Sequence, residues 1–224
     1  MLVAVLCYSR LCYIEFSLAE KKEDFYRCVV NALRYFGGLT RKIIFDNLKR
    51  MLAYSTISHV GFILMGVLSG SRDGVEAAVY YTLAYVIMAV AAFGMILLLS
   101  RRGFEAEELE DFRGLNARSR WFAGIMLVVM FSMAGVPPFL GFWAKLEVLG
   151  AAVEAGMVWL AVAGVIFSVI GAFYYLRVVK LMYFDKPTDT EPLQAGLDTQ
   201  VVLSLNGLLV LLLGLFPAGL LSLC

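Results

Sequence analysis

Residues 121–145 have the sequence WFAGIMLVVMFSMAGVPPFLGFWAK, in which Lys145 is the first charged side chain. An uncharged run of this length is long enough to cross the hydrocarbon core of a membrane as a helix. The apolar stretch continues to residue 149, and a straight helix of that length would measure about 45 Å, too long for the bilayer. Because glycine and proline weaken or break helices, we expect an interruption near the middle, at Gly135, Pro137, Pro138 and Gly141.

Four further long apolar runs flank this broken one. Together they predict an all-α membrane protein with five transmembrane helices, at about residues 51–70, 77–100, 121–149, 155–183 and 199–222. The composition agrees, because 61% of the residues are hydrophobic and only 17% are charged, with a mean hydropathy of +0.81. A soluble domain carries about a quarter charged residues. A chain of 224 residues is also too short to shield five such helices inside a soluble core.

The loops between these runs differ in basic residues. One set contains Lys49 and Arg50, five arginines between residues 101 and 120, and Lys180 and Lys186. The loops expected on the other side contain only Arg72. The positive-inside rule therefore predicts a cytoplasmic 101–120 loop and a C-terminus outside the cytoplasm.

The first 46 residues form an atypical N-terminal segment, distinct from the transmembrane domain predicted for residues 47–224. Met1–Ala19 is apolar but is interrupted by Arg10 and Glu15, and residues 20–24 are all charged. This pattern fits a poor membrane span, an interfacial helix or a signal-like start, although no small-residue cleavage pattern stands out.

Several kinds of chemistry are excluded by composition. The net charge of +1 lacks the basic excess of a nucleic-acid-binding protein. A single histidine and four scattered cysteines predict neither a metal nor a haem site, so we interpret the cysteines as ordinary thiols: Cys7, Cys12, Cys28 and Cys224. No glycine-rich nucleotide motif or cysteine cluster is present. We therefore expect no cofactor-binding site and no catalytic site in this chain itself.

Two ionisable residues inside the apolar runs are candidates for ion transfer. Burial in a low dielectric disfavours an ammonium, so a buried Lys145 could bind and release a proton. Snorkelling to the interface explains its position equally well, since Glu147 and Glu154 indicate that the span is ending. His59 fits either a proton relay or an interhelical hydrogen-bonding residue. No partner for His59 is visible in the sequence, which favours the second alternative.

Other polar residues fit membrane boundaries. Lys49 and Arg50 directly precede the first span, where basic residues mark the cytoplasmic boundary. Tyr174, Tyr175 and Arg177 lie near the end of the fourth span and are typical of an interfacial anchor.

Three runs resemble the proton-antiporter-like membrane subunits of respiratory complex I, the NADH-quinone oxidoreductase. They are NLKRMLAYSTISHVG at 47–61, AGVPPFLGFWAK at 134–145 and FSVIGAFYYLRVVKLMYF at 167–184. The last run is close to the subunit N branch, called chain 2 in mitochondria. Lys145 argues against the subunit M branch, which usually has glutamate there. Together the motifs are specific, and the resemblance covers about residues 47–222.

The resemblance implies a fold of fourteen helices in two inverted repeats, of which this chain would hold the last five. It also implies that Lys145 transfers protons on the broken helix, with His59 and Lys49 lining the approach. Partner subunits would bind NADH, FMN, iron–sulfur clusters and quinone, while this chain would contact other membrane subunits and the lipid bilayer. The implied location is the bacterial inner (plasma) membrane, rather than the mitochondrial one.

Two departures from the family pattern keep alternatives open. Residues 1–46 do not match the pattern, and the first repeat is absent, so the chain is expected to be a fragment or a split subunit. A subunit of a multi-subunit sodium/proton antiporter would share the broken helix and its lysine. A remnant without function is the third alternative.

Overall fold

The computed structural model of the protein describes residues 2–6, 11–15, 47–100, 106–187 and 196–222. The chain divides into two compact units, Met1–Ile44 and Phe45–Cys224.

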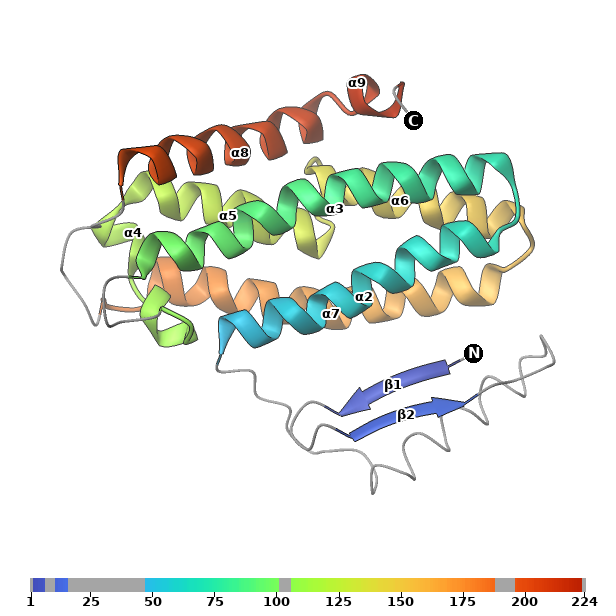
Figure 1. Cartoon of the computed structure of the whole chain (residues 1–224), viewed down its shortest axis with the longest axis horizontal. Coiled ribbons are helices and arrows are strands. Elements are labelled where there is room, and N and C mark those ends of the chain that lie inside the picture. The colour runs from blue at the N-terminus through green and yellow to red at the C-terminus, as the bar shows by residue number, and fades with distance from the viewer. Residues whose placement is uncertain (1, 7–10, 16–46, 101–105, 188–195, 223–224) are drawn as a thin grey trace. The chain divides into compact units, whose positions relative to one another are not determined.

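In the first unit, β1 (Leu2–Leu6) and β2 (Leu11–Glu15) form a two-stranded antiparallel sheet, drawn in blue in Figure 1. Its register runs from Leu2 opposite Glu15 to Leu6 opposite Leu11. These two segments are strands and not the helix considered for this stretch. β1 contains Val3 and Val5, and β2 contains Tyr13 and Ile14, residue types that favour strands. The charged cluster at residues 20–24 lies outside the described residues.

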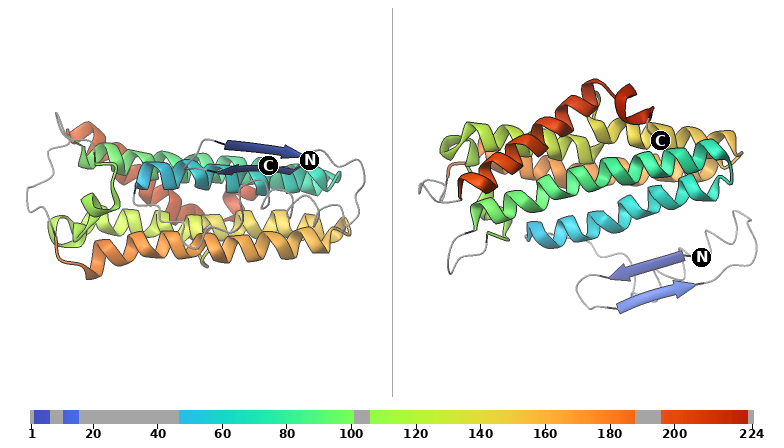
Figure 2. Two further views of the ribbon diagram at one scale, coloured as in Figure 1. Left: turned by 90° about the horizontal axis from the view of Figure 1, so that it is seen from below. Right: turned by 45° about the horizontal axis from the view of Figure 1, so that its top comes forward.

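The second unit consists mainly of long helices that run side by side in an antiparallel bundle (Figures 1 and 2). Its elements in chain order are α2 (Leu48–Leu68), α3 (Arg72–Leu99), the short 3-10 helix η1 (Leu109–Phe112), α4 (Leu115–Arg118), α5 (Arg120–Ala134), α6 (Leu140–Glu154), α7 (Val158–Phe184), α8 (Leu197–Leu215) and α9 (Ala218–Leu221).

Four described helices are long and apolar enough to cross a membrane: α2, α3, α7 and α8. The expected third span is divided into α5 and α6, each of 15 residues. Each is about 22 Å long, less than the roughly 30 Å of a hydrocarbon core. Figure 1 shows them following one another along the bundle. The helical membrane fold is confirmed, whereas a count of five complete spans is not.

The helix boundaries differ from those expected where charged or special residues begin or end a helix. α3 starts at Arg72 and not near residue 77, because Ser71 caps it by accepting the Gly74 N–H at 3.0 Å and Arg72 pairs with Glu76 at 2.8 Å. At the other end of the unit, α8 stops at Leu215, just before Pro217. Hydropathy alone does not reveal the Ser71 cap, the ion pair or the effect of the proline on where a helix ends.

The core of the bundle lies along α3, which packs against α2, α5, α6 and α8. Small and flexible side chains on α3 are fully buried there, among them Ala84, Met88, Ala91, Ala92 and Met95. Without a hydrophobic drive between helices in lipid, small residues favour association because they let the backbones approach closely. α3 therefore positions α2, α5 and α6, while α7, which also forms the site, packs mainly on α5.

α5 ends in a Schellman turn. Gly135 follows the helix with a φ of 85°, a conformation that glycine adopts without a steric penalty. Its N–H donates to the Ser132 carbonyl at 3.0 Å, and the Val136 N–H donates to the Phe131 carbonyl at 3.0 Å. This pattern satisfies two carbonyls of the last turn and leaves the final two to other donors.

α6 begins directly against the end of α5. The connection contains Pro137 and Pro138, and the N–H of Gly141 donates to the Ser132 hydroxyl at 2.9 Å. A Cβ on Gly141 would lie only 2.0 Å from the Ser132 carbonyl oxygen. Only glycine fits this contact, which holds the two half-helices together across the break.

Candidate functional site

Lys145 lies in the second turn of α6 and is buried, with 9% of its surface exposed. Its Nζ donates to the Met133 carbonyl at 3.0 Å, the Ala134 carbonyl at 2.9 Å and the Ser168 hydroxyl of α7 at 2.7 Å. Three acceptors match the three donors of an ammonium group. Snorkelling would require an exposed ammonium, so the structure favours the buried alternative.

Two of these acceptors are the carbonyls that the Schellman turn leaves over. The C-terminal end of a helix carries a partial negative charge, which stabilises a cation there. Gly135 makes the approach possible, because a Cβ at that position would lie 2.9 Å from Lys145 Cδ and 3.0 Å from its Nζ. Gly135, the helix break and Lys145 thus form one cation-binding site.

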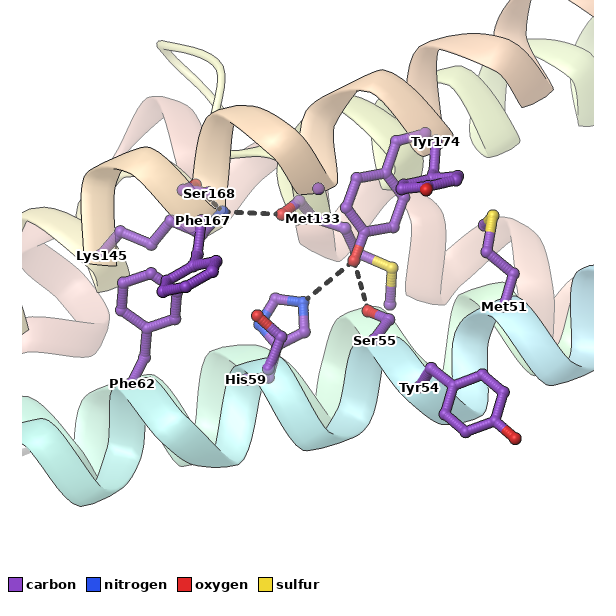
Figure 3. A pocket seen from close by; sticks show the side chains of 13 residues that line it. Met51, Tyr54, Ser55, His59, Phe62, Met133, Lys145, Phe167, Ser168 and Tyr174 are labelled. Atoms are coloured by element: carbon purple, nitrogen blue, oxygen red, sulfur yellow. Dashed lines mark hydrogen bonds between the residues drawn. The ribbon is translucent and has the colours of Figure 1, made fainter. Parts of the chain in front are cut away.

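A cavity of about 170 Å³ lies beside this cation-binding site, with walls that include α2, α6 and α7 (Figure 3). A cavity of this volume is large enough to hold water. Its polar lining includes Ser55, Ser58, His59, Lys145, Ser168 and Tyr175. Intramembrane ionisable residues usually face a bundle interior or a water-filled cavity of this kind.

His59 lies on α2 and is 3% exposed. Its Nδ1 is 2.8 Å from the Tyr81 hydroxyl of α3, and its Nε2 is 3.5 Å from the Tyr175 hydroxyl of α7. The Tyr175 hydroxyl also forms a hydrogen bond with Ser55 Oγ, and the Tyr85 ring stacks on the imidazole with centroids 4.5 Å apart. His59 therefore links three helices at the cavity wall.

Lys145 and His59 line the same cavity, but among the described residues no hydrogen bond joins them. Phe62 follows His59 by one turn of α2, and its ring centroid lies 5.5 Å from Lys145 Nζ. Figure 3 shows Phe62 and Phe167 beside the lysine side chain, away from the imidazole hydrogen bonds. A proton passing between the two ionisable groups would need water or hydroxyl groups between them.

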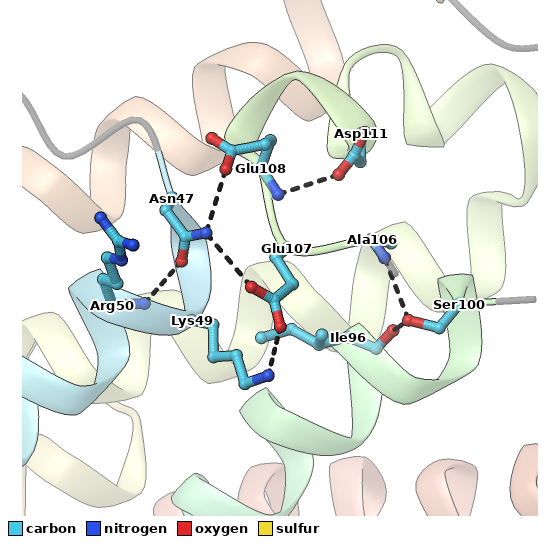
Figure 4. Close-up of polar contacts among 9 residues, drawn as sticks. All are labelled: Asn47, Lys49, Arg50, Ile96, Ser100, Ala106, Glu107, Glu108 and Asp111. Carbon is cyan, nitrogen blue, oxygen red and sulfur yellow. Dashed lines mark hydrogen bonds and ion pairs between the residues drawn. The ribbon is translucent and has the colours of Figure 1, made fainter. Parts of the chain in front are cut away.

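Lys49 does not line the cavity. It lies in the first turn of α2 and forms an ion pair with Glu107 (Figure 4). Asn47 caps the same helix by accepting the Arg50 N–H at 2.8 Å, and its amide donates to Glu108 Oε1 at 3.0 Å. These contacts fasten the segment after α3 to the start of α2.

The same segment also reaches the end of α7. The Gly114 N–H donates to the Leu181 carbonyl at 2.9 Å, and Arg113 lies 3.5 Å from the Asp185 carboxylate. Within this segment, partial burial raises the pKa of the Asp111 carboxyl. The start of α2, the 106–118 segment and the end of α7 therefore meet at one end of the bundle.

The sequence did not identify two residues as part of the site. Tyr175 was expected to be an interfacial anchor, but it is only 6% exposed and its hydroxyl faces the cavity. Ser168 was not singled out. Ser168, Gly171 and Tyr175 follow the i, i+3, i+7 spacing of one helix face, and this stripe in an otherwise apolar helix is a signal that could have identified both residues.

A buried lysine at a helix break beside a cavity lined in part by polar side chains is characteristic of one class of membrane protein. Irregular backbone at membrane depth is tolerated where protein or a water-filled cavity surrounds it, and transporters use discontinuous helices at their ion sites. In the described part of the chain, no group of three or more histidine, cysteine, aspartate and glutamate side chains could hold a metal ion. The fold and the site are those of a multi-pass membrane protein of the transporter type.

The chain belongs to the NADH:quinone oxidoreductase/Mrp antiporter transmembrane family, whose profile matches residues 32–171. It is 68% identical over 177 residues to NADH-quinone oxidoreductase subunit N of Thioalkalivibrio sulfidiphilus, an alignment that covers 79% of this chain and 37% of that relative. The chain thus spans well under half the length of the curated relative. The resemblance to subunit N found in the sequence is confirmed.

The fold is also found in solved structures. It matches a chain of respiratory complex I from Thermus thermophilus with bound aureothin, with a TM-score of 0.71 and 30% identity over 80% of this chain and 40% of that one. The Mrp complex from a Dietzia species matches with a TM-score of 0.68 over 77% of this chain and 40% of its own, and at 24% identity this likeness shows the fold alone. The membrane-spanning helices and the bacterial relatives indicate an inner-membrane protein.

Proposed function

We propose that this chain forms the lysine-bearing part of a proton-translocating membrane subunit of NADH-quinone oxidoreductase. The observation that carries the proposal is the Lys145 ammonium, held inside the bundle between the end of α5 and Ser168 at the wall of a cavity whose lining includes serine, histidine and tyrosine side chains. Unlike arginine, a lysine can lose its proton when its surroundings become less polar. The site therefore combines a group that binds one proton with a path along which water can deliver it.

Two local effects would set the charge of Lys145, one constant and one that depends on the water content of the cavity. The carbonyls at the end of α5 favour the ammonium at all times, because they are fixed in the backbone. Water in the cavity favours it only while water is present, since removing solvent penalises a charged group. A change in neighbouring subunits that fills or empties the cavity would therefore load or unload the proton.

His59 and Lys49 receive different roles in this proposal. His59 lies on the cavity wall with hydrogen bonds to two tyrosines, which suits a group that orders the proton path near Lys145. Lys49 lies outside the cavity, two residues before Met51, which does line it. We place Lys49 and its partner Glu107 at the surface approach to the path and not within it.

The loops support a defined orientation in the membrane. Lys49, the arginines of the 106–120 segment and Lys180 lie toward one end of the bundle, because that segment bonds to both the start of α2 and the end of α7. The positive-inside rule makes this end cytoplasmic and the C-terminus external. A reporter enzyme active only outside the cytoplasm should be active when fused after Cys224. Activity of a cytoplasm-specific reporter at the same position would reverse the orientation.

The redox chemistry belongs to partner subunits in this proposal. Subunits other than this chain would bind NADH, FMN, iron–sulfur clusters and quinone, and this chain would assemble with the other membrane subunits. An affinity-tagged chain purified in mild detergent should therefore bring with it flavin, iron–sulfur clusters and NADH dehydrogenase activity. Recovery with small antiporter subunits instead would support the sodium/proton antiporter alternative. Absence of the chain from isolated membranes would indicate a remnant.

A further inference from the structure

The three acceptors around the Lys145 ammonium are not equivalent. Met133 and Ala134 offer backbone carbonyls, which accept hydrogen bonds and carry no proton to pass on. Ser168 offers a hydroxyl at 2.7 Å, which both accepts and donates. Of the described groups bonded to Nζ, Ser168 is thus the one that can relay a proton.

A neutral lysine amine makes different demands from an ammonium. It keeps two donors and gains a lone pair, so one of its three neighbours must become a donor. The carbonyls of Met133 and Ala134 cannot do this. The Ser168 hydroxyl can rotate, because its own donation to the Ala134 carbonyl is long, at 3.5 Å. Ser168 can therefore stay bonded to Lys145 in both protonation states.

The position of Ser168 connects this hydroxyl to the cavity. Ser168 is half-buried on α7 and lines the cavity together with Gly171 and Tyr175 of the same helix face. A Cβ on Gly171 would meet no atom within 4 Å, so the space next to the hydroxyl along α7 is open. Figure 3 shows Ser168 next to the lysine side chain at the cavity.

The hydroxyl at the helix break, that of Ser132, is already engaged elsewhere. Ser132 donates to the Met88 sulfur at 2.9 Å and accepts the Gly141 N–H at 2.9 Å. These contacts hold the start of α6 against α5, and Ser132 is not part of the cavity lining. Its role is structural, whereas Ser168 faces both the ammonium and the cavity.

We propose that Ser168 relays the proton between Lys145 and water in the cavity, an inference that rests on the proposed proton-translocating function. On release, the Nζ–H bond breaks and that proton bonds to Ser168 Oγ, while the original hydroxyl proton passes to a cavity water. The lysine becomes a neutral amine, the serine is unchanged in composition, and the water becomes hydronium. Proton uptake is the reverse sequence.

The test measures NADH-driven proton uptake by inverted membrane vesicles that contain the complete complex with this chain. Ser168→Ala removes the relay hydroxyl and should slow proton uptake by about tenfold, the cost of losing one hydrogen-bonding partner of a charged group. Ser168→Thr restores a hydroxyl and should keep uptake within about twofold of the native rate. Ser204→Ala is the matched control, because this α8 serine bonds to Trp121 and does not line the cavity.

Two results would overturn the relay. One is native uptake in Ser168→Ala. The other is an equal loss in the alanine and threonine variants, which would show that the hydroxyl is not what matters. If the alanine variant fails to assemble, Ser168→Cys replaces it, since a thiol of similar size is a weak donor. Its uptake should then fall below that of the threonine variant, and equal uptake would also overturn the proposal.

The Lys145→Ala variant separates this inference from the proposed function. Native uptake in Ser168→Ala with uptake lost in Lys145→Ala would reject the relay alone. Uptake retained in Lys145→Ala would reject the role of the lysine, and the relay with it.

Discussion

Replacing Lys145 by alanine should lower NADH-driven proton uptake by at least about tenfold, because a positioned proton-transfer group typically contributes about 10²–10⁴-fold to a rate. The change removes the side chain whose ammonium lies at the end of α5, leaving the Met133 carbonyl without that donor and the Ala134 carbonyl with the long contact from Ser168. NADH oxidation with an artificial acceptor should continue, because that chemistry belongs to partner subunits in the proposed function. The measurement compares proton uptake with this oxidation in the same vesicles.

Lys145→Arg separates proton transfer from charge. Arginine keeps a cation at the end of α5, but it cannot lose its proton in proteins. We therefore expect normal assembly with proton uptake as low as in the alanine variant. Restored uptake would mean that a fixed charge suffices, contrary to the proposed mechanism. Lys180→Ala, which changes an exposed lysine on α7, serves as the control and should pump at the native rate.

Gly141→Ala should destabilise the chain by about 3 kcal/mol, the upper part of the range for an overpacked core. The new methyl group would lie 2.0 Å from the Ser132 carbonyl oxygen and 2.8 Å from its carbonyl carbon. These are backbone atoms, so the clash is relieved only if α6 separates from α5. Thermal unfolding of the purified complex in detergent, together with the amount of chain recovered from membranes, measures the effect.

Gly150→Ala is the matched control for this prediction, because it is the same change in the same helix. A Cβ on Gly150 would meet no atom within 4 Å. We expect a change within about 0.5 kcal/mol, as for substitutions that make no new contact. Similar stability for the two variants would show that the close contact between the half-helices is not what holds the break together.

The membrane fold could be predicted from the sequence because it depends on quantities that a sequence carries directly. Length and hydropathy determine whether a segment crosses the bilayer, and the cluster from Gly135 to Gly141 indicates a break. Boundaries were harder to predict. Arg72, Asp73 and Glu76 fit in the first two turns of α3, where the Ser71 cap and an i, i+4 ion pair accommodate them.

The site could be predicted only in part. Lys145 was identified, but the sequence left burial and snorkelling equally possible, because the choice depends on which way α6 faces after the break. Tyr175 was misassigned because the apolar run ends soon after it, whereas α7 continues to Phe184. The partners of the ammonium could not be found at all. Two are backbone carbonyls, and Ser168 lies 23 residues away on another helix.

The close fit between Gly141 and Ser132 limits how an alternating gate can operate. Because the two half-helices touch through their backbones, they should move as one rigid piece. Lys145 and the two backbone carbonyls that hold its ammonium would move with them. Opening toward one side of the membrane or the other must then come from α2 and α7, which reach the amine through single side chains, Phe62 and Ser168. The broken helix would then be the rigid element of the bundle, and the unbroken helices α2 and α7 would be the elements that move relative to it.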